Sequence, residues 1–117
     1  MGYYTYYDLS VVNEDKFSKE ELIKAAKALA NITDIIDEKD ISEDYPFSWI
    51  SDESMKWYDY DSDMTELSGL FPEMKFKLYG EGEERDDNWI AYYYNGEGTI
   101  CQGHLYFDDP PEWIYED

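Results

Sequence analysis

Alternation of hydrophobic and polar residues predicts three of the strands in this chain. A hydrophobic residue recurs at every second position from Tyr7 to Val11, within the strand-forming segment 3–12. Residues 54–60 (SMKWYDY) alternate in the same way, and so do residues 74–81 (MKFKLYGE), whose two lysines would face outward. This period of two is typical of strands that have one buried face.

Two further strands are predicted near the C-terminus. Residues 88–94 (NWIAYYY) and 99–107 (TICQGHLYF) flank Asn95-Gly96, a dipeptide suited to the positive φ angles of a tight hairpin turn. The acidic segment that follows contains Trp113, which we expect to fold back onto the sheet.

A helical spacing of hydrophobic residues marks two segments between the strands. The first begins with a capping box formed by Ser18 and Glu21. Its buried side is predicted to consist of Leu22, Ala25, Ala26 and Leu29. The second helix is expected to be capped by Ser62 and to end around Gly69 and Pro72.

The segment 31–42 (NITDIIDEKDIS) is compatible with two structures. Either Ile32 and Ile36 prolong the first helix, or Ile35 lies in a short strand. The order of elements predicts one α+β domain over residues 1–117, with a mainly antiparallel sheet and two helices on one face. With a strand at Ile35, the first six elements follow the ferredoxin-like order βαββαβ, and a C-terminal hairpin is added.

The charge of the chain excludes two classes of partner. There are 9 basic and 29 acidic residues, for a formal net charge of −20 at pH 7. Such self-repulsion usually accompanies disorder, but 19% of the residues are aromatic, which supplies enough burial for a folded domain. Nucleic acids and anionic membranes attract cations and would repel this chain. We therefore expect a basic protein partner that itself binds nucleic acid.

Cysteine use and the N-terminal residues predict an intracellular protein. Cys101 is the only cysteine, so the chain has no internal disulfide. The first residues are rich in tyrosine and lack the basic and apolar regions of a signal peptide. We expect a cytoplasmic location and no membrane-spanning segment.

Three aspartates resemble part of a calcium-binding loop. Asp59, Asp61 and Asp63 match the first, third and fifth ligand positions of an EF-hand. That loop requires glycine at its sixth position and a bidentate glutamate at its twelfth, where this chain has Met64 and Leu70. We therefore expect these aspartates to favour a helix N-terminus and not to bind calcium.

The segment GEGEERDD (residues 80–87) does not predict a phosphate site either. Phosphate-binding loops combine backbone N–H groups with a cation, whereas carboxylates dominate this segment and Arg85 alone cannot offset them. Gly80 and Gly82 are better explained by a bulge or bend in a strand. We expect no metal ion and no cofactor.

Residues suited to catalysis are few. His104 is the only histidine, and its odd spacing from Cys101 sends the two side chains to opposite faces of a strand. No G-x-S-x-G, C-x-x-C or H-E-x-x-H motif occurs. We therefore expect a protein without enzymatic activity.

The candidate binding surface consists of carboxylates with tyrosines among them, gathered on one flank. Same-face carboxylates on a strand lie about 6.6 Å apart, which gives about one charge for every two phosphates of a DNA strand. Such a surface would imitate nucleic acid, whereas the alternative is an acidic exterior that only keeps the protein soluble. The predicted partner-binding residues are Asp59, Asp61, Asp63, Glu81, Glu83, Glu84, Asp86 and Asp87, with Tyr58 and Tyr92 as anchors.

Two stretches, MGYYTYYDLSV and residues 56–97, carry a distinctive pattern of short motifs: KWYD, FP, GEGEE, D-x-W and Y-x-x-N-G. In this pattern the chain resembles a set of small proteins from phages and bacterial mobile elements. The resemblance does not cover residues 30–54. A looser likeness is to phage proteins with a ferredoxin-like domain. A phage origin implies an inhibitor of host defence, of the anti-CRISPR or anti-restriction type. The resemblance does not assign a catalytic or binding role to any residue of this chain.

These observations predict a phage-type accessory protein that binds and blocks a nucleic-acid-handling defence protein of the bacterial host. The alternative is a structural or self-assembling module without nucleic-acid mimicry. In that alternative, aromatic side chains at strand edges pair between copies, as in a homodimer, and the acidic loop is dispensable.

Overall fold

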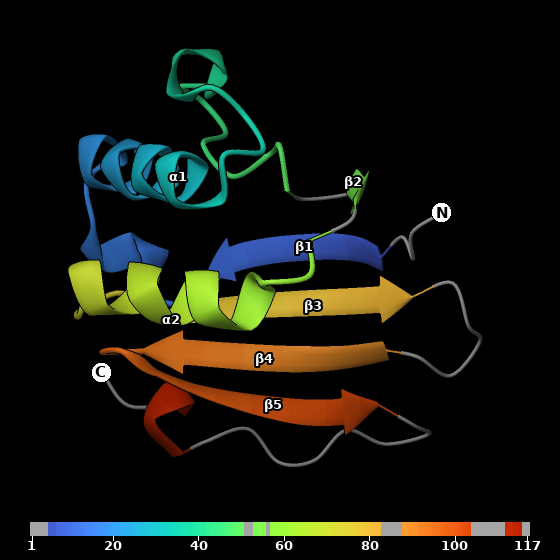
Figure 1. Cartoon of the computed structure of the whole chain (residues 1–117). Coiled ribbons are helices and arrows are strands. Elements are labelled where there is room, and N and C mark those ends of the chain that lie inside the picture. The colour runs from blue at the N-terminus through green and yellow to red at the C-terminus, as the bar shows by residue number, and fades with distance from the viewer. Residues whose placement is uncertain (1–4, 51–52, 56, 83–87, 104–111, 116–117) are drawn as a thin grey trace.

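The computed structural model describes residues 5–50, 53–55, 57–82, 88–103 and 112–115 (Figure 1). The helices and strands are, in chain order, β1 (Thr5–Val11), α1 (Lys19–Thr33), β2 (Glu53–Met55), α2 (Tyr60–Leu70), β3 (Phe76–Gly82), β4 (Asn88–Tyr94) and β5 (Glu97–Gly103). Short 3-10 helices are η1 (Glu14–Lys16), η2 (Glu38–Asp40) and η3 (Glu112–Tyr115).

The strands form one antiparallel sheet in the order β2-β1-β3-β4-β5. Both α1 and α2 lie over the same face of this sheet, and their buried side chains share one core with it (Figure 1). The predicted α+β fold, with two helices on one face of an antiparallel sheet, is therefore confirmed. Because β1 lies between β2 and β3, α2 connects two parallel strands that are not neighbours.

The ferredoxin-like order of elements is not confirmed. Helix α1 includes Ile32 but ends at Thr33, and its C-cap Asp34 has a left-handed backbone with φ of 57°. A left-handed residue at this position directs the chain out of the helix. Ile35 lies in a bend and is 43% exposed, so the strand required there is not formed, and Ile36 lies beyond the helix.

The start of α1 agrees with its prediction. The side-chain oxygen of Ser18 accepts a hydrogen bond from the backbone N–H of Glu21 at 3.2 Å, and a Glu21 carboxylate oxygen accepts from the backbone N–H of Ser18 at 3.3 Å. This reciprocal capping box satisfies donors that a helix end leaves free. Ala25, Ala26 and Leu29 are fully buried, as their spacing predicted.

Helix α2 begins earlier than its sequence suggested. Among the described residues of the predicted strand 54–60, residues 54 and 55 lie in β2, and Tyr60 is already helical. Asp59 is the N-cap, and the hydroxyl of Ser62, the predicted cap, donates to the backbone carbonyl of Asp59 at 3.2 Å. The acidic residues of the first turn stabilise a helix N-terminus, which explains the earlier start.

Strand β3 alternates as predicted, and Phe76 and Leu78 are buried against the helices. Lys75, which directly precedes β3, faces away from the helices as predicted, but it is only 4% exposed. Its ammonium nitrogen lies 5.7 Å from the centroid of the Tyr94 ring. The aromatic face attracts the cation, so the lysine lies along the sheet surface instead of extending into solvent.

The predicted turn between the last two strands is confirmed. Asn95 and Gly96 have φ angles of 51° and 79°, and they connect β4 directly to β5. Positive φ at both central residues matches the right-handed twist of the paired strands.

The main core lies between the helices and the sheet, and its packing requires a residue without a side chain at position 80. Trp89, the partner of Gly80 in the β3–β4 ladder, lies with its ring directly over this glycine. A Cβ at Gly80 would come within 2.2 Å of the indole. The close approach of this ring, and not a bulge, therefore accounts for the glycine. Other members of this core are Tyr7, Leu9, Val11, Leu29, Trp57, Met64, Leu67 and Tyr93.

The opposite face of β4 and β5 is covered by η3. Trp113 stacks on Tyr94 with 5.1 Å between ring centroids and meets Tyr92 edge-on at 6.4 Å. The expectation that Trp113 folds back onto the sheet is confirmed. Tyr92 packs with Cys101 and Ile114 and is 7% exposed, so its prediction as an exposed anchor is wrong.

Candidate functional site

Two of the predicted partner-binding carboxylates accept hydrogen bonds from the core. The indole N–H of Trp57 donates to Asp63 Oδ2 at 2.8 Å, and the hydroxyl of Tyr93 donates to Asp61 Oδ1 at 2.9 Å. Both rings are buried. A buried N–H or O–H that lacks an acceptor is costly, and a carboxylate is a stronger acceptor than a neutral oxygen. Asp61 and Asp63 therefore hold the first turn of α2 against the aromatic core.

These surroundings raise the pKa of two core tyrosines. Burial raises the pKa of Tyr93, and the adjacent Asp61 raises it further as a hydrogen-bond acceptor and a negative charge. Burial also raises the pKa of Tyr7 to about 12, and its hydroxyl donates to the backbone carbonyl of Trp57 at 3.0 Å. Both tyrosines therefore remain neutral hydrogen-bond donors at physiological pH.

The outer side of the same helix start faces solvent. Tyr58 is 67% exposed, and Asp59 and Glu66 are exposed as well. Asp59 makes no side-chain capping bond. The exposure expected of Tyr58 and Asp59 is confirmed, and their contact with a partner remains a prediction.

Glu81 lies on the other face of the sheet. Because Phe76 and Leu78 point toward the helices, Glu81 points away from them, beside its register partner Tyr6. The remaining predicted carboxylates, Glu83, Glu84, Asp86 and Asp87, lie outside the described residues. Glu81 therefore lies on the face of the sheet opposite to α2, whose start carries the three predicted aspartates, and the gathering of all eight carboxylates on one flank stays a prediction.

The row of carboxylates along one strand, expected of a strand-based DNA mimic, is also not formed in the described strands. No strand carries more than one carboxylate, because Asp8, Glu53, Glu81 and Glu97 lie on four different strands and β4 has none. The other acidic residues that the structure describes lie mainly in helices and loops.

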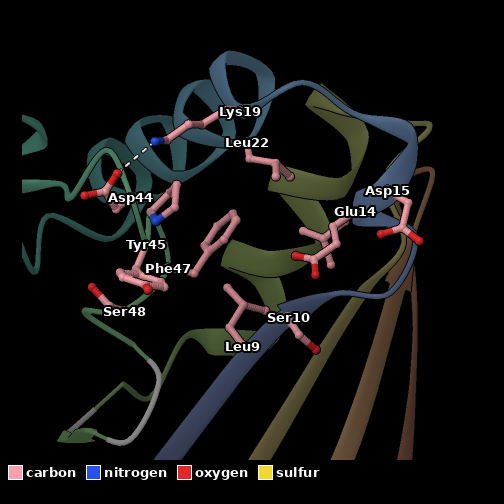
Figure 2. Close-up of a pocket in the computed structure, with 12 residues that line it drawn as sticks. Leu9, Ser10, Glu14, Asp15, Lys19, Leu22, Asp44, Tyr45, Phe47 and Ser48 are labelled. Carbon is pink, nitrogen blue, oxygen red and sulfur yellow. Dashed lines mark hydrogen bonds and ion pairs between the residues drawn. The ribbon is translucent and has the colours of Figure 1, made fainter.

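A groove that the sequence did not predict lies beside the end of β1 (Figure 2). Its volume is about 700 Å³, and its walls come from β1, η1, the start of α1 and the loop 44–48. The apolar lining residues are Leu9, Val11, Leu22, Tyr45, Pro46 and Phe47. The polar lining residues are Ser10, Glu14, Asp15, Lys19, Asp44 and Ser48. The groove therefore combines an apolar floor with a mainly acidic rim.

The single ammonium on this rim is already engaged. Lys19 Nζ lies 2.8 Å from Asp44 Oδ1, in a solvent-exposed ion pair that links α1 to the loop (Figure 2). The hydrogen bond raises the pKa of Lys19 and lowers that of Asp44. Glu14 and Asp15 are exposed and take part in no ion pair within the described part of the chain. The rim keeps an excess of negative charge.

The loop that forms one wall presents two aromatic rings. Tyr45 is 74% exposed, while Phe47 is half-buried and packs on both parts of the core beneath α1. The backbone carbonyl of Phe47 accepts from the N–H of Ile50 at 3.1 Å, and Ile50 is fully buried. The buried Ile50 and this hydrogen bond hold the loop in place, although the loop contains no regular helix or strand.

The groove has no signature in the sequence because the residues that form its walls are far apart in the chain. Residues 44–48 have no period of two or of 3.6, so they predicted only an irregular segment. The ion pair to Lys19 spans 25 residues and leaves no local pattern. The available signal was Tyr45-Pro46-Phe47, two aromatic residues around a proline beside acidic residues.

Neither a metal centre nor a membrane span emerges from the residues that the structure describes. Within them, no three histidine, cysteine or acidic side chains are placed to hold a metal ion. No helix among them is long and apolar enough to cross a membrane. His104, the only histidine of the sequence, lies outside the described ranges.

Comparison of the chain with protein-family models, with curated proteins and with solved structures found no match in any of the three.

Proposed function

We propose that this chain is an acidic accessory protein that binds a basic, nucleic-acid-handling protein of host defence and blocks it. The main support for this proposal is the exposure of the carboxylates. In the described part of the chain almost every carboxylate is exposed, and only Asp44 and Asp37 are paired with lysines, Lys19 and Lys39. The surface charge therefore remains available to a cationic partner.

The physical basis is electrostatic attraction between unlike surfaces. An acidic protein is drawn to a groove or patch that evolved to hold phosphates, and occupying it excludes the nucleic acid. Because exposed charges are screened by salt, such binding weakens steeply as ionic strength rises. The resemblance to phage proteins favours a CRISPR or restriction nuclease of the bacterial host as the partner.

The geometry favours docking through separate patches over imitation of a regular phosphate backbone. Carboxylates on the described strands do not repeat along any one strand. The first patch combines Tyr58 and Asp59, which directly precede α2, with Glu66 on that helix. The second patch is the acidic rim of the groove. Each patch places an aromatic ring beside carboxylates, a combination that suits protein interfaces.

Competition with DNA tests this function. A purified CRISPR or restriction nuclease is mixed with a fluorescent target duplex, and the chain is added while polarisation reports the bound duplex. The proposal predicts displacement at about 50 mM salt that is weakened at least about tenfold at about 300 mM. Cleavage of the duplex should be inhibited over the same range of concentrations.

Polyglutamate of matched total charge serves as the control for a general polyanion effect. The chain should displace the duplex at a lower concentration than polyglutamate does, because folded patches present rings and fixed charges together. Equal potency of the two, or failure of the chain to compete at low salt, contradicts the proposed function.

Self-association is the second candidate, and one observation favours it. Strand β5 forms an edge of the described sheet, and its Ile100 is 39% exposed. Exposed strand edges pair readily with a second copy. Light scattering distinguishes the candidates, because a monomer at micromolar concentration contradicts self-association and leaves the proposed inhibitor function intact.

A further inference from the structure

We propose that the groove beside β1 binds an arginine-bearing segment of a protein partner. This inference rests on the proposed function only in taking the partner to be basic, and it names the part of the surface and the side chain that make the contact. Three features of the groove support this inference: its size, its charge and its aromatic rings.

The size and floor of the groove suit a long side chain. A volume of about 700 Å³ is in the range of ligand sites and accommodates a few residues of an extended peptide. Leu9, Val11 and Leu22 give the groove apolar walls, against which the aliphatic stem of an arginine can pack. A purely polar ligand would leave this apolar surface without contact.

The charge of the groove selects a cation. Its lining contains the carboxylates of Glu14, Asp15 and Asp44 and the ammonium of Lys19. Because Lys19 is held by Asp44, Glu14 and Asp15 remain to receive an incoming positive charge. Among the residues that line the groove, an anionic ligand would meet these two carboxylates with no free cation to offset them, so the lining disfavours an anion.

The rings of the groove favour arginine over lysine. Figure 2 shows Tyr45 and Phe47 on one side of the groove and Glu14 and Asp15 on the other. A planar guanidinium stacks on an aromatic ring and at the same time donates two parallel hydrogen bonds to a carboxylate. An ammonium is a compact and strongly hydrated charge that cannot make both contacts in this way.

A titration followed by NMR tests the inference. The probe is the synthetic peptide acetyl-Gly-Leu-Arg-Leu-Arg-Gly-amide, added to the isotope-labelled chain at low salt. We expect saturable shifts confined to residues 9–15, 19–22 and 44–48. The same peptide with citrulline in place of arginine keeps the shape and loses the charge, and it should bind at least about tenfold more weakly.

Paired variants locate the contact. The rim variant E14Q/D15N should weaken binding of the arginine peptide by about fivefold or more. The control variant E20Q/D40N removes two exposed carboxylates outside the groove and should change binding less than about twofold. Equal losses in both variants would show that only total charge matters, and they would overturn the inference.

Other outcomes are equally decisive. Equal binding of the citrulline and arginine peptides contradicts the inference. Peptide-induced shifts centred on the smaller pocket of 240 Å³ near Phe17 and Leu70 also contradict it.

The nuclease assay separates the inference from the proposed function. If the rim variant still displaces DNA from the nuclease as well as the unmodified chain does, the groove is not the contact and the proposed function stands. If the peptide binds in the groove and no nuclease is inhibited, the inference stands and the proposed function fails.

Discussion

The first turn of α2 and the rim of the groove contain the same kinds of residue and differ in what those residues contact. In α2, Asp61 and Asp63 accept hydrogen bonds from the buried rings of Tyr93 and Trp57. On the rim, Glu14 and Asp15 face an open groove and make no ion pair within the described residues. One pair of carboxylates is part of the fold, and the other is available to a partner.

Whether an aspartate supports the fold therefore depends on hydrogen-bond donors that reach it from the core, and not on the local density of acidic residues. The segment around Asp61 is among the most acidic in the sequence, yet two of its carboxylates serve the core. The segment around Glu14 looks balanced in sequence because lysines surround it, yet Glu14 and Asp15 form no ion pair with any residue that the structure describes. Three predictions separate the two regions, in order of decreasing effect.

The largest effect is expected from D61A/D63A. Both buried rings lose their acceptors, so the free energy of unfolding should fall by about 2–5 kcal/mol. Urea denaturation measures the change. The control variant D59A/E66A removes two exposed carboxylates from the outer side of the same helix. It should lower the free energy of unfolding by less than about 1 kcal/mol. Equal losses in the two variants would mean that the hydrogen bonds to the rings are unimportant.

The second effect is a loss of stability at alkaline pH. Because the pKa values of Tyr7 and Tyr93 are raised in the fold, the folded state keeps two protons that the unfolded chain releases. Their contribution is complete below the ordinary tyrosine pKa of 10.0 and is lost as pH rises through the raised pKa values. For Tyr7, whose pKa is about 12, the loss amounts to about 2–3 kcal/mol.

The variant Y93F sharpens this test, because it removes one of the two protons. Between about pH 10 and pH 12 the free energy of unfolding of the variant should fall less steeply than that of the unmodified chain, by up to about 1.4 kcal/mol per pH unit. Identical slopes for the two proteins would show that Tyr93 is not held neutral by its surroundings.

The smallest effect is expected from E14Q/D15N on stability. Both side chains are exposed and make no ion pair in the described part of the chain, so the free energy of unfolding should change by less than about 0.5 kcal/mol. Urea denaturation again provides the measurement. A loss of more than about 1 kcal/mol would give these carboxylates a role in the fold and would remove the contrast with α2.

Local patterns were sufficient to predict much of the fold. The capping box at Ser18, the turn at Asn95-Gly96 and the alternation in β3 depend on residues close in sequence, and each was predicted. The start of α2 and the bend at Ile35 were not predicted. At the start of α2, acidic side chains in the first turn outweigh the hydrophobic pattern. Before Ile35, the left-handed backbone of Asp34 does so.

The candidate site was less predictable, because tertiary contacts define it. The exposure of Tyr58 and Asp59 followed from the sequence, whereas the burial of Tyr92 depends on Trp113, which lies 21 positions later in the chain. The roles of Asp61 and Asp63 depend on which rings reach them. The groove required residues 44–48 to fold over β1, and no period in the sequence indicates that contact.

The most direct test compares the affinity of E14Q/D15N and D61N/D63N for the arginine peptide, with both variants folded and equal in charge. We expect the first variant to lose about fivefold or more in affinity, whereas the second should stay within about twofold of the unmodified chain. Loss of affinity in D61N/D63N equal to or greater than that in E14Q/D15N would contradict the division between carboxylates that hold the fold and carboxylates that bind a partner.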